Sequence, residues 1–185
     1  TQFSEQWFHK NAGASGSAVA DADIDTPDAW DITTGGLTAA GDTIVVCVIE
    51  GGNLEHPELI ENAWFNHGEI PNNGIDDDNN GYVDDYQGWN VESENDEGVY
   101  IGNHGTSVMG LIGAKGNNNL GVTGVNWDIK IMSVAGESLM DEASVVEAYT
   151  YPLVQRRLYN ESEGTRGAFV VATNASWGLD GGDPD

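Results

Sequence analysis

The chain has 185 residues, of which 31 are acidic and 6 are basic, so its formal net charge is −25. A charge of this size and sign argues against nucleic acids and anionic membranes as partners, and it favours bound cations or a saline habitat. The length suffices for one domain with a sizeable core, the single Cys47 excludes an intrachain disulfide, and no apolar run approaches the roughly 18 residues of a membrane span.

The first 25 residues predict an N-terminal arm rather than a regular element. They are polar and small, with Trp7 and Phe8 as the large anchors, and we expect residues 1–25 to lie extended on the domain. The start lacks Met and a charged-then-apolar leader, which is typical of a processed mature N-terminus. A helix is predicted from residue 26, with Thr26 as its N-cap and Pro27 in its first turn.

A strand buried on both faces is predicted over residues 42–49. The run is continuously apolar and β-branched at its centre, the pattern of a parallel sheet covered by helices on both sides. Glu50 follows at once, and Gly51 and Gly52 come after it. An acid at the carboxyl end of such a strand stands where open α/β sheets place their sites, although a solvated loop acid gives the same local pattern.

A calcium site is predicted inside the long loop of residues 66–103, which shows little periodicity. Its acidic core runs from Asp76 to Asp85 and places acids or amides on alternate residues before the turn at Gly81. So many acids in ten residues repel one another unless a cation is present, and oxygen ligands suit Ca²⁺. The alternative is a solvated acidic loop. The expected ligands are Asp76, Asp78, Asn80, the backbone carbonyl of Tyr82, and Asp85.

A histidine at a helix N-terminus is predicted by the segment His104-Gly105-Thr106-Ser107-Val108-Met109-Gly110. Val108, Leu111 and Ile112 would form the apolar stripe of that helix. At this position the helix dipole disfavours the imidazolium form, so the ring is ready to accept a proton. A histidine that merely caps the helix remains an equal alternative on this segment alone.

The second half of the chain alternates strands with a helix. Strands are predicted over residues 129–134 and 167–173, and a helix over residues 141–159, in which Pro152 should cause a kink or an early end. Its buried stripe is expected from Val146, Tyr149 and Leu153. Strands that alternate with helices imply an α/β fold, with a parallel β-sheet flanked by helices.

Four segments together resemble the subtilisin-like serine proteases, the subtilase or peptidase S8 family. The match extends over roughly residues 26–180, nearly the whole chain. Residues 48–59 resemble the segment of the catalytic aspartate, 104–110 that of the catalytic histidine, 118–125 the loop that follows, and Ser176-Trp177-Gly178 the substrate-binding strand.

The resemblance implies a serine endopeptidase that hydrolyses peptide bonds. His104 would be the general base and Glu50 the acid that orients it. An extended peptide would lie beside the substrate-binding strand, with Gly136, Glu137 and Ser138 on its other side. The resemblance also implies secretion and a second calcium site that involves Glu58, Asn118 and carbonyls of the 116–122 loop.

The chain departs from the family pattern in two ways. Glu50 stands where the family usually has aspartate, and the 185 residues stop before the segment that carries the family's nucleophilic serine. We expect residues 26–185 to be the N-terminal part of a peptidase domain, incomplete in this chain. A separate C-terminal fragment of the same precursor would complete it and supply the serine. Residues 1–185 alone should then not fold stably, because a parallel sheet needs cover on both faces. The alternative is an inactive subtilase retained as a binding or scaffold module.

Overall fold

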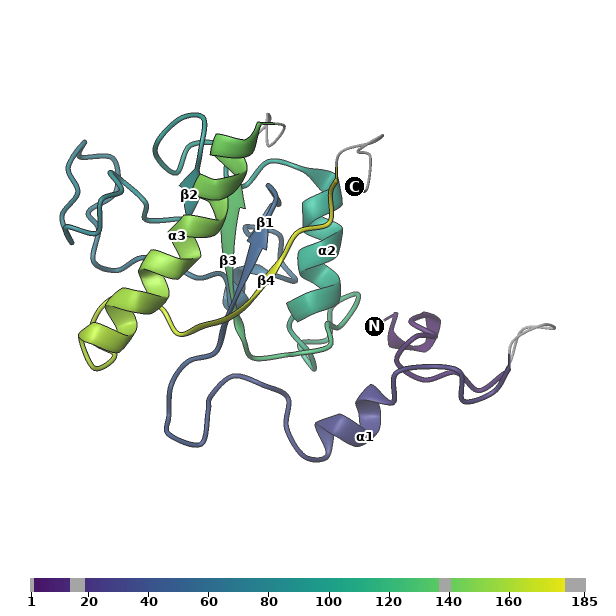
Figure 1. The fold of residues 1–185 in the computed structure, drawn as a ribbon. Helices are drawn as coiled ribbons and strands as arrows, with labels where there is room; N and C mark the ends of the chain where they lie inside the picture. Colours follow the sequence, from purple (N-terminus) through teal and green to yellow (C-terminus); the bar gives the residue numbers. More distant parts are fainter. Residues whose placement is uncertain (1, 14–18, 137–140, 179–185) are drawn as a thin grey trace, which may run out of the picture.

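The structure, a computed structural model, describes residues 2–13, 19–136 and 141–178. These residues contain a sheet of four parallel strands in the order β2-β3-β1-β4, as Figure 1 shows. The strands are β1 (Val45–Ile49), β2 (Trp89–Asn90), β3 (Lys130–Ala135) and β4 (Val170–Asn174). The helices are α1 (Thr26–Trp30), α2 (Asn103–Gly113) and α3 (Glu142–Glu161), with short 3₁₀ turns η1 (Phe3–Glu5) and η2 (Ile60–Asn62). The predicted α/β class is confirmed.

The two faces of the sheet carry separate cores. On one face, β1 and β3 pack against Ala148 and Tyr151 of α3, together with Trp89. On the other face, Val48 and Ile131 pack against Met109 of α2 and the loop that follows β1. Successive strand residues point to opposite faces, which is why a continuous apolar run such as β1 contributes to both cores.

The three predicted strands are present with shifted boundaries. The run at 42–49 forms β1 from Val45, the run at 129–134 forms β3, and the run at 167–173 forms β4 from Val170. Strand β2 lies inside the predicted loop and was missed, because two residues are too short for a periodic pattern. It pairs with the carboxyl end of β3 at the edge of the sheet.

The predicted stripe of α2 is confirmed for Val108 and Ile112, which are partly buried against the core, and is wrong for Leu111. Met109 is completely buried with Gly105 and Gly113, whereas Leu111 is 51% exposed. The buried set follows a spacing of i, i+4, i+8 and is built around glycines, so it carries little hydrophobic signal. Close packing of the helix backbone, rather than large side chains, decides which face of α2 turns inward.

The predicted stripe of α3 is wrong as well, and its reason is geometric. The buried residues are Ala148, Tyr151, Pro152 and Gln155, while Val146, Tyr149 and Leu153 are exposed. The two sets have the same periodicity but differ by two residues, which is about 200° around a helix. Pro152 neither ends nor shortens α3, since the helix continues to Glu161.

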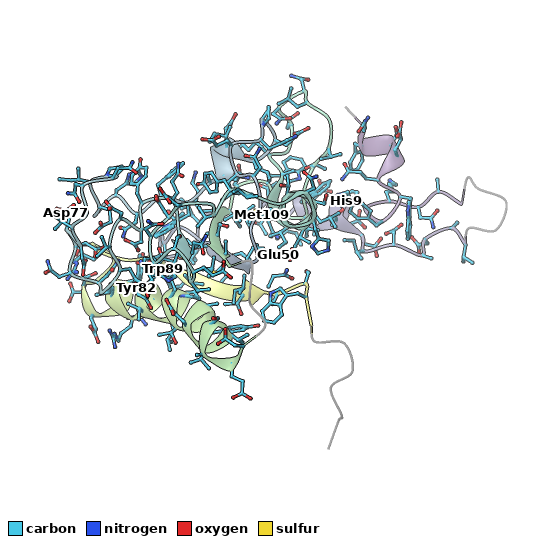
Figure 2. All side chains as sticks on the ribbon, turned by 90° about the horizontal axis from the view of Figure 1, so that it is seen from above. His9, Glu50, Asp77, Tyr82, Trp89 and Met109 are labelled. Atoms are coloured by element: carbon cyan, nitrogen blue, oxygen red, sulfur yellow. The ribbon has the colours of Figure 1, made fainter. Side chains whose placement is uncertain are left out.

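The N-terminal segment is held by His9 together with Phe8, which is partly buried against the His9 ring, and not by Trp7. Trp7 is exposed, whereas His9 is completely buried. The ring of His9 bonds to Thr26 and to the carbonyl of Thr123, so Thr26 is engaged there and Asp25 takes the N-cap position of α1. Figure 2 shows His9 at the opposite end of the molecule from the acidic loop around Asp77.

Candidate functional site

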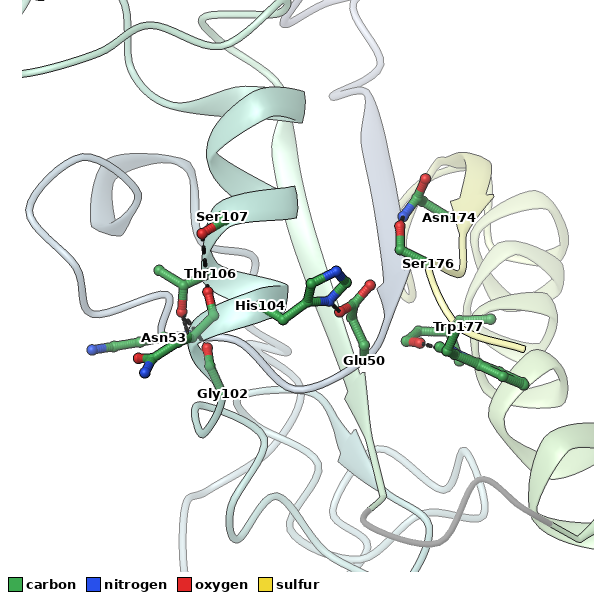
Figure 3. Close-up of polar contacts among 11 residues, drawn as sticks. Glu50, Asn53, Gly102, His104, Thr106, Ser107, Asn174, Ser176 and Trp177 are labelled. Carbon is green, nitrogen blue, oxygen red and sulfur yellow. Dashed lines mark hydrogen bonds and ion pairs between the residues drawn. The ribbon is translucent and has the colours of Figure 1, made fainter. Parts of the chain in front are cut away.

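Glu50 follows the last residue of β1, at the carboxyl edge of the sheet. The three residues before it, Cys47 to Ile49, are completely buried, so the strand that delivers the acid is fixed in the core. The side chain of Glu50 is 12% exposed and points toward the N-terminus of α2, as Figure 3 shows. The edge predicted from the sequence therefore does hold this acid.

Glycines allow α2 to approach the end of β1 closely. A side chain at Gly105 would collide with the carbonyl oxygen of Gly51, and one at Gly52 would lie 2.7 Å from the backbone of Gly105. The backbone N–H of Asn53 also donates to the hydroxyl of Thr106, over 2.8 Å. The spacing between β1 and α2 is thus set by backbone contacts, which no larger residue would permit.

His104 and Glu50 form a close pair. The Nδ1 atom of His104 lies 2.6 Å from Oε2 of Glu50. Because the carboxylate can only accept, Nδ1 carries the hydrogen, and in the neutral ring Nε2 keeps its lone pair. Within the described residues, no hydrogen bond is formed by Nε2, and the His104 side chain is 70% exposed. The ring is oriented on one side and open on the other.

The segment after β4 reaches the same edge of the sheet. The indole N–H of Trp177 donates to the carbonyl of Ile49 over 2.6 Å, which ties this segment to the residue before Glu50. The Ser176 hydroxyl accepts from the side chain of Asn174. Gly178 faces open space, with no atom within 4 Å of the place where a side chain would start.

Gly136 lies on the other side of Glu50, after β3. It lines a cavity of 410 Å³ together with Gly51 and Ile101, the residues that flank the Glu50–His104 pair. Glu137 and Ser138, predicted to contact a substrate, lie outside the described residues. Glu50 and His104 therefore stand between the segment at Ser176 and the cavity at Gly136.

With this geometry established, the family can be assigned. A profile of the Subtilase family matches residues 41–183. The chain belongs to the subtilase family.

Named relatives of this subtilase are proteases. Subtilisin-like protease 1 of Plasmodium berghei is 41% identical over 97 residues, which cover 51% of this chain and 16% of that protein. The Plasmodium falciparum protein of the same name is 43% identical over 89 residues, covering 47% of this chain and 13% of that protein. An extracellular protease of Xanthomonas campestris is 31% identical over 157 residues, covering 79% of this chain and 25% of that protein. The matches thus span a quarter or less of these relatives.

The predicted ligand residues in the acidic loop of this subtilase make hydrogen bonds within the loop. Asp76 accepts from the backbone N–H groups of Asn80 and Gly81, and Asp78 lies near it. The side chain of Asn80 bridges the backbone N–H of Tyr82 and the carboxylate of Asp85. Of the three carboxylates expected as ligands, Asp76 and Asp78 belong to the compact acidic group found among the described residues, and Asp85 does not. The third member of this group is Glu69.

Asp85 is completely buried and turned toward α3. Its carboxylate accepts from the hydroxyl of Tyr151 at 2.7 Å and from the amide of Gln155 at 2.9 Å. It also accepts from the amides of Asn66 and Asn80. Burial raises the pKa of the Asp85 carboxyl to about 7, although these hydrogen bonds act in the opposite direction. Neutral donors thus hold Asp85 as a link between the loop and the helix.

At the expected second calcium site, the side chain of Glu58 contacts the loop of residues 116–122. The buried carboxylate of Glu58 accepts from the backbone N–H of Val122 over 3.0 Å and from the amide of Asn118 over 3.3 Å. The backbone N–H of Gln2 donates to the carbonyl of Gly121 in the same loop. The structure therefore brings Glu58 and the 116–122 loop together.

None of the helices in the described part of the chain combines the length and apolar character that a membrane crossing demands.

Proposed function

We propose that this chain carries the acid and the base of a secreted serine endopeptidase. The observation that carries the proposal is the 2.6 Å contact between Glu50 and His104, in a subtilase whose named relatives are proteases. Glutamate is longer than aspartate by one methylene. The close backbone contact between the end of β1 and α2 places His104 within reach of this longer side chain.

The chemistry follows from the two ends of the imidazole. A serine hydroxyl attacks the carbonyl carbon of the peptide bond, and Nε2 of His104 takes its proton. The ring is then positively charged, and the Glu50 carboxylate on Nδ1 stabilises it. His104 next delivers the proton to the leaving amine, which separates from the acyl group. Glu50 remains ionised throughout and keeps the ring in the productive tautomer.

An extended peptide is the proposed substrate. It would pair with Ser176, Trp177 and Gly178 through main-chain hydrogen bonds, with Gly136, Glu137 and Ser138 on its other side. The open space at Gly178 supports entry of a substrate side chain there. The net charge of −25 gives no support to a nucleic acid or an anionic membrane as a partner.

The nucleophilic serine would come from a C-terminal fragment of the same precursor. An exposed apolar surface supports this partner, because Val146, Tyr149 and Leu153 of α3 and Val171 of β4 are exposed. Strand β4 is also an edge strand of the described sheet, and an edge strand can pair with a further strand. The fragment would extend the sheet beyond β4 and cover this face of α3.

Calcium is the proposed stabilising cofactor. The contacts between Glu58 and the 116–122 loop support one ion, whose carboxylate and carbonyl oxygens are ligands that Ca²⁺ prefers. Secretion is supported by the similarity to the extracellular protease of Xanthomonas campestris.

The proposal is tested in the full protein by peptide hydrolysis and by labelling with a fluorophosphonate, which reacts with activated serines. Glu50→Gln should lower kcat by roughly 10⁴-fold, because the amide favours the wrong tautomer of His104. Glu55→Gln is the matched control, since Glu55 is an exposed acid of the same loop and should leave the rate unchanged. Full activity of Glu50→Gln would contradict the triad. A folded wild-type protein that neither labels nor hydrolyses peptides would favour the inactive scaffold.

A further inference from the structure

Glu92 is the one charged residue, among those the structure describes, that lines the 410 Å³ cavity at Gly136. The rest of the lining consists of glycines, small or amide side chains and one aliphatic residue. The cavity starts where two strands end, because Gly51 follows Glu50 after β1 and Gly136 follows β3. A group bound there would lie beside the segments that hold the acid and the base.

The edge of the sheet places Glu92 at this cavity. Strand β2 pairs with the carboxyl end of β3, with Asn90 opposite Ala135. The backbone N–H of Val91 donates to the carbonyl of Ala135 over 3.0 Å. Glu92 comes directly after this bond, and its own backbone N–H donates to the side-chain oxygen of Asn90 over 3.0 Å. The backbone of Glu92 is therefore fixed relative to β3 and to the cavity that begins at the end of β3.

The loop that carries Glu92 is closed by hydrogen bonds to Asn90. The side-chain amide of Asn90 donates to the carbonyl of Glu97 over 2.7 Å, and its backbone N–H donates to the carbonyl of Asn95 over 2.8 Å. The carbonyl of Asn90 accepts from the backbone N–H of Glu94. A loop held by its own hydrogen bonds forms a wall that exists before a ligand arrives, and binding to such a wall costs little ordering entropy.

Ile101 adds an apolar surface to the same cavity. This large aliphatic side chain is 72% exposed. Its backbone is fixed against the end of β1, since a side chain at Gly51 would collide with the carbonyl oxygen of Ile101. The cavity thus combines an aliphatic surface with a carboxylate. Lysine and arginine side chains match this combination, because their methylene stems pack on apolar surface while their charged groups stay with an acid or water.

We propose that this cavity binds a lysine or arginine side chain of the peptide substrate, with Glu92 as the residue that selects the positive charge. The inference rests on the proposed peptidase function, and it adds the kind of substrate side chain that is preferred. The stem of that side chain would pack on Ile101, and its charged group would pair with the Glu92 carboxylate.

The arrangement suits an extended peptide that enters two places at once. Glu50 and His104 stand between the open space at Gly178 and the cavity at Gly136. Successive side chains of an extended strand point to opposite sides. A peptide that directs one side chain to Gly178 therefore directs the neighbouring side chain toward the cavity.

The test measures kcat/KM of the full protein for matched peptides that differ at one position, which carries lysine, norleucine or glutamate. Norleucine keeps the methylene stem of lysine without the charge, and the variable residue is moved in turn along the positions before the cleaved bond. At one of these positions kcat/KM for the lysine peptide should exceed that for the norleucine peptide by about 2- to 5-fold, the size expected of a partly exposed ion pair. The glutamate peptide should be the poorest, and high salt should reduce the differences.

Variants at Glu92 separate its effect from the general attraction of an acidic chain for cations. Glu92→Gln should bring the lysine and norleucine peptides to equal kcat/KM, and Glu92→Lys should make the glutamate peptide better than the lysine peptide. The matched control is Glu94→Gln, which changes the net charge equally in the same loop, since Glu94 is exposed and does not line the cavity. This control should keep the preference for lysine.

The outcomes distinguish this inference from the peptidase proposal. Hydrolysis without any preference for lysine, or an equal loss of preference in Glu92→Gln and Glu94→Gln, would overturn the role of Glu92 and leave the peptidase function standing. If the full protein hydrolyses no peptide, the peptidase function fails, and calorimetric binding of the same peptides decides the inference. Tighter binding of the lysine peptide that is lost in Glu92→Gln would support it, and equal binding of the lysine and norleucine peptides would overturn it.

Discussion

His9 and His104 differ in burial and in the hydrogen-bond partners of their ring nitrogens. His9 is completely buried, and both of its ring nitrogens have neutral partners. Its Nδ1 lies 2.7 Å from the hydroxyl of Thr26, and its Nε2 lies 3.1 Å from the carbonyl of Thr123. His104 is 70% exposed, with one nitrogen on a carboxylate and the other open.

The difference teaches that the partners of a histidine matter more than its position in the sequence. A carbonyl can only accept, so Nε2 of His9 donates to it, and in the neutral ring Nδ1 accepts from the Thr26 hydroxyl. Burial, which disfavours the charged form, lowers its pKa. In His104 the carboxylate on Nδ1 stabilises the positive charge that the ring gains when the open Nε2 accepts a proton. A satisfied neutral ring stabilises structure, and a half-satisfied ring beside an acid is suited to catalysis.

The largest expected effect is the loss of peptidase activity when His104 is replaced. In the full protein, His104→Ala should lower kcat by roughly 10⁴- to 10⁶-fold, because the general base is removed. Its free energy of unfolding should change by less than about 0.5 kcal/mol, since the side chain is mostly exposed. Steady-state peptide hydrolysis and denaturant unfolding measure the two quantities. A variant that retains its rate would show that His104 is not the base.

Replacing Glu50 by the shorter aspartate tests whether the length of the acid side chain matters for its contact with His104. Glu50→Asp should lower kcat by roughly 10- to 100-fold, although it restores the usual residue of the family, because the carboxylate withdraws by about 1.5 Å. The contact between Gly51 and Gly105 prevents α2 from moving closer to compensate. The rate of peptide hydrolysis is the measurement, and Glu55→Asp is the control. An equal or higher rate would show that the backbone adjusts.

Removing the buried ring should affect stability and not chemistry. His9→Ala loses two hydrogen bonds and the packing against Phe3, Phe8 and Trp30, which should lower the free energy of unfolding by about 2–4 kcal/mol. The rate of peptide hydrolysis below the melting temperature should stay within about twofold of wild type. Chemical denaturation followed by circular dichroism tests the first expectation. A stable His9→Ala protein would remove the structural role.

The smallest expected effect is a pH dependence of stability. The pKa of His9 in the folded state lies below its ordinary value of 6.5, so below that pH the unfolded chain gains a proton first. Stability should therefore be fully present above about pH 6.5. It should fall on acidification by at most about 1.4 kcal/mol per pH unit until the folded pKa is passed.

The matched comparison is His9→Gln, whose amide can donate and accept in place of the ring but does not titrate. The difference between the unfolding free energies of wild type and His9→Gln should shrink as the pH falls from about 7 to about 5. A difference that is constant with pH would mean that His9 titrates equally in both states.

Much of the fold was predictable because buried parallel strands have a strong local signal. The β-branched runs predict β1, β3 and β4 directly, and the end of β1 places Glu50 at the edge of the sheet. Apolar periodicity predicted the inward face of α2 only in part, at Val108 and Ile112, and it did not predict the face of α3. Met109 packs among glycines in α2, and in α3 a polar residue, Gln155, lies inside while Leu153 lies outside.

The candidate site residues also differ in whether local sequence features predict them. Glu50 and His104 could be proposed from strand and helix ends, which are local features. The buried positions of Glu69 and His9 could not, because both depend on how irregular segments fold back: Glu69 accepts from backbone N–H groups 8 and 9 positions away. His9 meets Thr123, which lies 114 positions away. The periodicity of apolar residues carries no information about such a contact. It becomes visible only in the structure, as a buried polar side chain in an irregular segment.

Trp177 gives the molecule an internal optical reporter. Its indole N–H donates to the carbonyl of Ile49, the residue before Glu50, and its ring is packed against the core beneath the sheet edge. Indole emission depends on the hydrogen bonding and polarity around the ring. A peptide bound along this segment should thus change the fluorescence of a residue joined directly to the strand that ends at Glu50. The proposed binding of a peptide there can then be followed without a label.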